Sequence, residues 1–140
     1  MIVPFKENHF YSLDVQDAQR YIHQYIAPEN VTALENGTAF TYLVDGVPVA
    51  IFGWSAIYPT RAVMWSVLGK QSPSHLLEMT RIAKRLIDQL PYKRLEMDVD
   101  YEFEQAHRWA VMLGFELEVP RLRCSRVDGG DCAIYSRILP

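Results

Sequence analysis

A strand-loop-helix pattern at residues 94–116, RLEMDVDYEFEQAHRWAVMLGFE, constrains the fold of this 140-residue chain more than any other stretch. Leu95, Met97 and Val99 alternate with acidic residues, as on a strand that buries one face. A helical segment follows and ends at Gly114, a residue that commonly terminates helices. The pattern therefore predicts a strand, a short loop and a helix, in that order.

The composition is that of a globular protein with a core of ordinary size. Hydrophobic residues make up 49% of the chain and charged residues 22%, and this length fits a single domain spanning residues 1–140. No apolar run approaches the roughly 18 residues of a membrane span, and no signal-peptide core follows the N-terminus. We therefore expect a cytoplasmic protein without a membrane partner. The net charge of −3 gives no general attraction to nucleic acid.

The sequence of the first half predicts one strand and two helices, followed by a group of three strands. The Asp45-Gly46 pair between two apolar runs is the strongest short-range signal of a β-hairpin. The expected elements are a strand at 2–5, a helix from an Asp14 cap to residue 26, a short helix at 29–34, and strands at 39–44, 47–57 and 61–68.

The second half predicts a long helix, the opening strand-helix pattern and a closing hairpin. Ser72-Pro73 combines a helix cap with proline at the first helical position, and the helix is expected to end at Leu90. The turn signal at residues 128–130 predicts a hairpin between strands 116–126 and 131–138. The complete expected order is β-α-α-β-β-β-α-β-α-β-β.

The two cysteines, Cys124 and Cys132, flank the predicted closing turn. A cross-strand disulfide is the alternative, but nothing in the sequence indicates an oxidising compartment, so we expect free thiols. His9 and His23 have no companion carboxylate or cysteine at metal-ligand spacing. No metal site is expected.

The element order and the pattern at 94–116 resemble the GCN5-related N-acetyltransferases, the GNAT superfamily. There, a strand of the form L-x-L-x-V leads into a helix that contains an alanine and closes on Leu-Gly-Phe. The matching positions are Leu95, Met97, Val99, Ala106, Leu113, Gly114 and Phe115. The resemblance implies an α+β fold, layered α/β/α, with a central mixed and mostly antiparallel sheet. It also implies transfer of an acetyl group from acetyl-CoA to an amine, which the sequence does not identify.

The loop after the fourth strand departs from the family pattern. In GNAT enzymes this loop has the form R/Q-x-x-G-x-G/A and cradles the pyrophosphate of acetyl-CoA, whereas Leu68, Gln71 and Pro73 stand at the three diagnostic positions. A positive charge, hydroxyls and helix-start amides remain available for an anion. The alternative is a plain Ser-Pro helix cap beside a lysine that faces water. The expected cofactor-binding residues of this degenerate loop are Val67, Leu68, Gly69, Lys70, Gln71, Ser72, Ser74 and His75.

The resemblance also implies a base, a backbone N–H on the fourth strand as oxyanion donor, and often a tyrosine as acid. Ala110 stands at the usual tyrosine position, and Phe103 replaces an asparagine often found near the helix start. We expect Asp98 as the candidate base and Tyr101 as the candidate acid. For Asp98 the alternative is a structural hydrogen-bond acceptor. His107 is expected at the boundary of the helix's apolar stripe.

Two functions of different class therefore remain open. The first is an acyl-CoA-dependent N-acetyltransferase-like protein with reduced activity and an amine acceptor. The second is a non-catalytic GNAT-fold binding or structural protein with a protein partner. The hairpin at 46–50 and the Leu68–Lys70 loop are similar to those of small GNAT-like proteins of tailed-phage virions, which implies a bacteriophage virion or assembly component. The family resemblance makes a homodimer the expected oligomer in either case.

Overall fold

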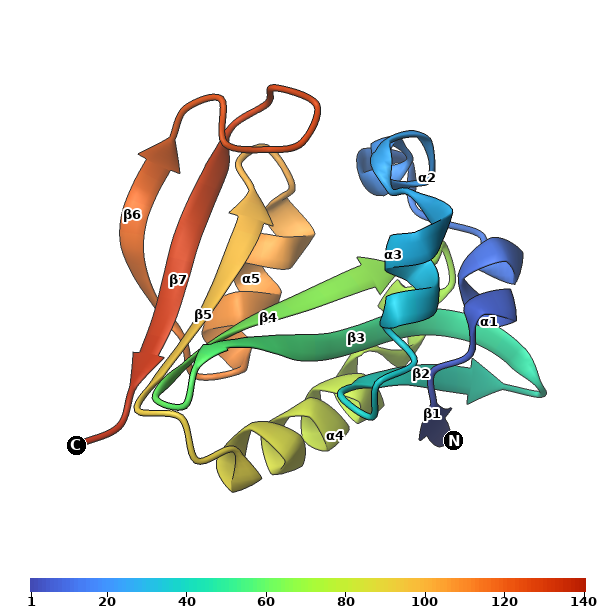
Figure 1. The fold of residues 1–140 in the computed structure, drawn as a ribbon, viewed down its shortest axis with the longest axis horizontal. Coiled ribbons are helices and arrows are strands. Elements are labelled where there is room, and N and C mark those ends of the chain that lie inside the picture. Colours follow the sequence, from blue (N-terminus) through green and yellow to red (C-terminus); the bar gives the residue numbers. More distant parts are fainter. The chain divides into compact units, whose positions relative to one another are not determined.

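The computed structural model describes all 140 residues and has the expected α+β architecture (Figure 1). In chain order the elements are β1 (Ile2–Pro4), α1 (Glu7–Ser12), α2 (Tyr21–Tyr25), α3 (Pro28–Ala33), β2 (Ala39–Val44), β3 (Val47–Tyr58), β4 (Arg61–Leu68), α4 (Leu76–Gln89), β5 (Arg94–Asp100), α5 (Glu104–Met112), β6 (Glu116–Leu122) and β7 (Cys132–Ile138). One-turn 3₁₀ helices precede α2 and α4.

All seven strands belong to one sheet, in the order β1-β2-β3-β4-β5-β7-β6. The β4–β5 pair is parallel, while β1–β2, β2–β3, β5–β7 and β6–β7 are antiparallel. The expectation of a mixed, mostly antiparallel sheet is therefore confirmed. The parallel ladder joins residues 61–64 to residues 94–97, and β4 and β5 both continue beyond its last pair.

The chain divides into two compact units, which are described separately. One unit contains residues 1–54 and 65–76, and the other contains residues 55–64 and 77–140. The single domain expected from the sequence stays a prediction.

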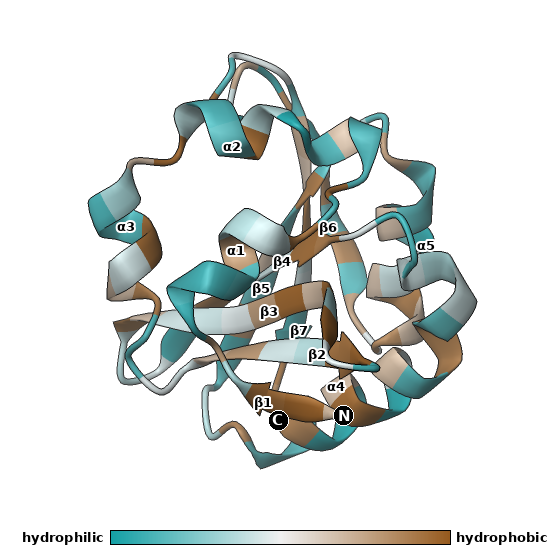
Figure 2. Cartoon of the chain, turned by 90° about the vertical axis from the view of Figure 1, so that its right-hand side faces the viewer, coloured by the Kyte–Doolittle hydropathy of each residue, from teal (hydrophilic) through white to brown (hydrophobic).

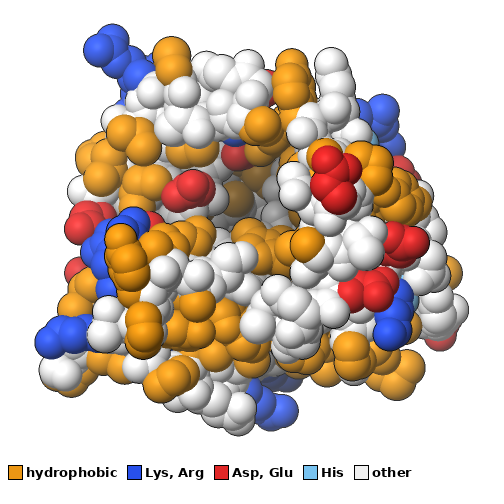
Figure 3. Space-filling view, viewed as in Figure 1, with side chains coloured by type: hydrophobic (Ala, Val, Ile, Leu, Met, Phe, Trp, Pro, Cys, Tyr) orange, Lys and Arg blue, Asp and Glu red, His pale blue; other side chains and the backbone are white.

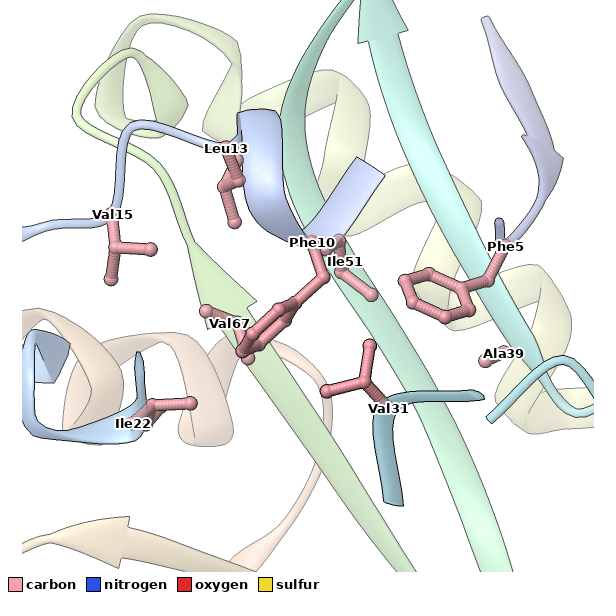
Figure 4. Packing of buried hydrophobic residues seen from close by; sticks show 9 residues of the cluster. All are labelled: Phe5, Phe10, Leu13, Val15, Ile22, Val31, Ala39, Ile51 and Val67. Atoms are coloured by element: carbon pink, nitrogen blue, oxygen red, sulfur yellow. The ribbon is translucent and has the colours of Figure 1, made fainter. Parts of the chain in front are cut away.

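The core of the first unit collects apolar side chains from helices and strands far apart in the sequence. Figure 4 shows these side chains pointing toward one another, with the ring of Phe10 among them. Each is at most 8% exposed, and fully burying a Val, Leu, Ile or Phe side chain contributes about 1.5–3 kcal/mol to folding. The cluster consists of Phe5, Phe10, Leu13, Val15, Ile22, Val31, Ala39, Ile51 and Val67.

The N-terminal segment differs from the sequence prediction. The continuous helix expected from Asp14 to residue 26 is wrong, and α1 lies before it where no helix was expected. Val15 is instead bridged to Gly69, and only a 3₁₀ turn at Asp17–Gln19 and the short α2 follow. The backbone N–H of Gln16 donates to Leu68 O, at the end of β4, at 2.9 Å. This N–H is therefore bonded to a strand and not to a carbonyl of a helix. Val15 and Ile22 pack in the core without a continuous helix between them, and Ala18 is exposed.

In the second unit, β5 is enclosed by β4 and β7, and β6 pairs with the outer side of β7. Arg137 of β7 donates hydrogen bonds to Ile87 O and Tyr92 O, at 2.9 and 3.0 Å, which anchors the end of α4. The helix expected over residues 72–90 begins as a 3₁₀ turn and becomes α-helical only at Leu76. Strand β6 ends at Leu122, four residues earlier than predicted.

Helices in both units have one apolar face. Figure 2 shows hydrophilic and hydrophobic residues on the same helix in α3, and α4 buries Met79, Ala83 and Ile87 on one side. None of the helices has the length and apolar character needed to cross a bilayer. On the face drawn in Figure 3, acidic and basic side chains are dispersed among apolar ones, without a continuous basic area.

Candidate functional site

The end of β4 carries the first candidate site, because one edge of its backbone is bound by a side chain rather than by a strand. The N–H of Gly69 donates to Val49 O of β3 at 2.8 Å. Successive residues of a strand direct their backbone groups to opposite sides, so Ser66 and Leu68 face away from β3. There, the Leu68 N–H donates to Gln19 Oε1 at 2.7 Å, and Gln19 Nε2 donates to Ser66 O at 3.1 Å. The Gln19 carboxamide thus takes the place of a neighbouring strand.

A second glutamine ties the same segment to the loop after β4. The backbone N–H of Gln16 donates to Leu68 O, and its side-chain Nε2 donates to Ser72 Oγ at 2.8 Å and Gly69 O at 3.2 Å. Gln19 is 8% exposed and Ser72 is fully buried. These polar contacts are therefore shielded from water, where an unpaired partner costs most.

Gly69 is required by close backbone approach inside the protein. A Cβ at this position would lie 2.6 Å from Val49 O, and 3.0 Å from Leu13 Cδ1. The space that a phosphate-binding loop leaves open for its ligand is here filled by β3 and the N-terminal segment.

The backbone N–H groups of this loop are largely committed to the protein itself. Besides Leu68 and Gly69, the Lys70 N–H donates to Asp14 O at 2.8 Å, the Ser72 N–H to Gly69 O at 3.0 Å, and the Ser74 N–H to Gln71 O at 3.2 Å. Pro73 has no N–H to offer. A pyrophosphate is held mainly by converging backbone N–H groups, so the loop in this arrangement does not fit one.

The side chains expected to bind the cofactor differ in their burial. Those of Val67 and Leu68 are buried, and Val67 belongs to the core cluster. The Ser72 hydroxyl, expected to face a phosphate, is a buried acceptor for Gln16. Gln71 and Ser74 are exposed.

The loop keeps two residues with side chains suited to an anion. Lys70 is exposed, with its Nζ 3.7 Å from Asp14 Oδ1. His75 is half-buried, and its ring centroid lies 5.9 Å from that of Tyr42. A single exposed ion pair of this kind is weak, so Lys70 remains able to turn toward another anion.

The second candidate site lies at the end of β5, in the other unit. Asp98 is an exposed residue on this strand and is paired in register with Ile134 of β7. Although the side chain reaches solvent, surrounding protein partly desolvates its carboxyl, which raises the pKa of Asp98, and the carboxylates of Glu96 and Asp100 raise it further. A raised pKa brings a carboxylate closer to the range in which a general base works.

Tyr101 follows β5 and is partly exposed. Its backbone N–H donates to Asp131 O at 3.0 Å, and the guanidinium of Arg121 lies 4.4 Å from its ring centroid. Tyr101 lines a small surface cavity of about 210 Å³ together with Glu102, Arg126, Gly130 and Asp131. The acid function of Tyr101 stays a prediction, as does the base function of Asp98.

The half-buried His107 and the buried Tyr135 form a pair that the sequence did not predict. The Nδ1 atom of His107 lies 2.8 Å from the Tyr135 hydroxyl, and its Nε2 lies 2.8 Å from Tyr101 O. A carbonyl oxygen can only accept, so Nε2 carries a proton; in the neutral ring Nδ1 then accepts from the tyrosine. Burial raises the pKa of Tyr135, with a contribution from Glu104.

The two departures from the family pattern are structural in this fold. Ala110 is 1% exposed and packs in the interior of the second unit. Phe103 precedes α5 as its N-terminal cap residue, without a side-chain hydrogen bond. Neither position presents a group that donates a proton.

Groups of thiols, carboxylates and imidazoles do not form a metal site. No cluster of three or more His, Cys, Asp or Glu side chains is placed to hold an ion. Cys124 is exposed and Cys132 is buried, and both are free, as expected.

The contacts of Gln16 and Gln19 are the features that sequence reasoning missed most clearly. Both glutamines stand in a segment whose apolar spacing suggested a surface helix, where glutamine is unremarkable. Their partners lie 47 to 56 residues away in the chain. Only the pairing of β4 with its neighbours makes these contacts visible.

Comparisons with known proteins agree on the fold. No protein-family model and no curated protein matches the sequence. Among solved structures, a probable acetyltransferase from Staphylococcus epidermidis has a TM-score of 0.77 at 12% identity, covering 100% of this chain and 99% of that one. Ard1 from Thermoplasma volcanium has a TM-score of 0.76 at 16% identity, covering 100% and 97%. A GNAT-family acetyltransferase from Bacillus anthracis has a TM-score of 0.70 at 12% identity, covering 98% and 93%. The chain therefore has the fold of the GNAT acetyltransferases.

Proposed function

We propose that this chain is an acetyltransferase-like protein of the GNAT fold that acts on an amine with acetyl-CoA as acyl donor, at reduced activity. The observation that carries the proposal is the similarity of fold along the whole chain to proteins described as acetyltransferases. Low sequence identity leaves the acceptor amine open, because in one fold the substrate is set by variable side chains.

Two groups at the end of β5 support an acid-base function. The Asp98 carboxyl has a raised pKa, which suits removal of a proton from an ammonium group. Tyr101, three residues further along the chain, has the residue type to return a proton to a leaving thiolate. The acyl group itself would be supplied by acetyl-CoA.

The state of the loop after β4 accounts for reduced activity. Its N–H groups are bonded within the protein, and the β4 N–H at Leu68, a candidate oxyanion donor, is bonded to Gln19. A donor already paired with a neutral carboxamide must lose that partner before it stabilises a developing oxyanion.

The same loop favours a second candidate function, a non-catalytic GNAT-fold binding or structural protein such as a bacteriophage virion or assembly component. The specific observation is that the segment matching the pyrophosphate cradle is closed by backbone contacts to Val49 and Asp14. Burial of Ala110 at the usual tyrosine position points the same way.

Isothermal titration of the purified protein with acetyl-CoA, followed by a thiol-release assay over a panel of amines, separates the two candidates. The acetyltransferase-like function predicts binding and amine-dependent thiol release that Asp98→Asn lowers. Absence of heat at millimolar acetyl-CoA, with no thiol release for any amine, would defeat it. The non-catalytic function would be defeated by acetyl transfer that depends on Asp98.

A further inference from the structure

We propose that residues 16–19 form an internal strap that occupies the free edge of β4 and has to leave before acyl-CoA binds there. The strap is an autoinhibitory contact, with the Gln19 carboxamide as its principal group. This inference rests on the proposed acetyltransferase-like function, since it names what keeps that function low.

At the edge of β4, the Gln19 carboxamide occupies the position that an amide of a bound ligand would take. The Gln19 carboxamide supplies an acceptor to the Leu68 N–H and a donor to Ser66 O. A secondary amide in an extended ligand offers the same donor and acceptor to a strand edge. Such a ligand and Gln19 therefore compete for the same two backbone groups.

The contact is buried, which gives it the strength that an exposed side chain lacks. Gln19 is 8% exposed, and Leu68 is 1% exposed. Removing the glutamine without a replacement would leave a buried N–H and a buried carbonyl unpaired. The open form, in which this edge has lost its partner, is therefore rare in the absence of a ligand.

Gln16 couples the β4 edge to the loop that follows. Its backbone N–H is bonded to Leu68 O, while its side chain holds Ser72 Oγ and Gly69 O. Movement of the strap would break these bonds together with those of Gln19. One displacement thus exposes both the strand edge and the buried Ser72 hydroxyl.

The effect on affinity follows from the population of the open form. A ligand that binds only when the strap is displaced has its apparent affinity reduced by the open fraction. Weakening the strap without touching β4 or the loop raises that fraction. The proposal therefore predicts that a variant lacking the Gln19 carboxamide binds acyl-CoA more tightly than the natural chain.

The test is isothermal titration with acetyl-CoA of the natural chain, Gln19→Ala and the control Gln24→Ala. Gln24 is an exposed glutamine on α2, a few residues beyond the strap. We expect Gln19→Ala to bind about tenfold more tightly, the size set by two net hydrogen bonds, and Gln24→Ala to match the natural chain. Equal, measurable binding by all three proteins overturns the strap alone. No binding by any of them overturns the proposed function and the strap with it.

Hydrogen exchange on the natural chain gives a second readout that does not depend on a variant folding. With saturating acetyl-CoA, the Gln16 N–H should lose protection, because its bond to Leu68 O is broken. The Leu68 N–H should stay protected, because the ligand amide replaces Gln19. Unchanged protection of Gln16 in the ligand-saturated protein overturns the strap.

Discussion

The indole N–H of Trp109 donates a hydrogen bond to Thr80 Oγ1 at 2.9 Å and links α5 to α4 within the second unit. Both residues are buried, at 7% and 6% exposure. In Thr80→Val the shape is kept but the indole N–H loses this acceptor. We expect a loss of about 1–2 kcal/mol in the free energy of unfolding, measured by urea denaturation. The control Thr60→Val changes an exposed threonine and should cost much less; equal losses would show that the hydrogen bond contributes nothing.

Glu96 is held by two arginines and gives the stability a defined pH dependence. Its carboxylate lies 2.7 Å from Arg61 Nη2 and 2.6 Å from Arg94 Nε. Burial by itself would raise the pKa of Glu96, but hydrogen bonds and charge from the arginines outweigh it and lower the pKa below its ordinary value of 4.5. A depressed pKa in the folded state contributes stability above the unfolded pKa, and this stability is lost as the pH falls through the folded pKa.

The matching experiment compares Glu96→Gln with the natural chain at pH 7 and pH 3. We expect Glu96→Gln to lose about 2 kcal/mol at pH 7, because two guanidinium groups keep only a neutral partner. The difference should shrink at pH 3, which lies below the ordinary pKa of 4.5, because the unfolded natural chain then binds a proton that the folded carboxylate resists. Glu116→Gln, an exposed carboxylate on β6, serves as control. A difference independent of pH would refute the assignment.

The fold was predictable where the sequence pattern and the packing coincide. Strands 39–44 and 61–68 have the bounds expected. Asp45-Gly46 fixes the hairpin between β2 and β3, and Pro59 follows directly after the end of β3. The region around Asp14 was not predictable, since its backbone bonds go to β4 rather than along a helix. For the same reason the sequence indicated the loop at 67–75 but not that its backbone N–H groups are bonded within the protein. A glutamine that binds a strand edge carries no local signal.

Gly69 provides a direct test of the closed loop. In Gly69→Ala the added Cβ would meet the backbone oxygen of Val49 at 2.6 Å, and a backbone atom in a sheet gives way at high cost. We expect a loss of about 1–3 kcal/mol, measured by thermal or urea unfolding. Gly130→Ala is the matched control, because its Cβ would meet the end of a side chain, the guanidinium of Arg126 at 2.8 Å, rather than a backbone atom. A loss in Gly130→Ala equal to that in Gly69→Ala would contradict the close approach to β3.

The contacts of His107 predict one tautomer. Its Nε2 faces a carbonyl oxygen of Tyr101, and its Nδ1 faces the Tyr135 hydroxyl. For the neutral ring of His107 we expect ¹⁵N chemical shifts typical of an Nε2–H imidazole. In Tyr135→Phe the Nδ1 atom loses its donor, so its resonance should shift while the tautomer stays the same. An Nδ1–H tautomer in the natural chain would show that the pair is arranged differently.

Asp98 yields the sharpest prediction about chemistry. Because desolvation and the carboxylates of Glu96 and Asp100 raise its pKa above the ordinary 3.8, the base form is lost at a higher pH than for a free aspartate. If Asp98 removes a proton from the amine, kcat/KM for acetyl transfer should rise with pH through that raised pKa and then level off. Asp98→Asn should lower kcat about a hundredfold and abolish this limb of the profile. Asp88→Asn, an exposed carboxylate on α4, should leave both unchanged. A variant Asp98→Asn with the natural rate and pH profile would instead make this carboxylate a structural acceptor on β5, and would leave the fold without its candidate base.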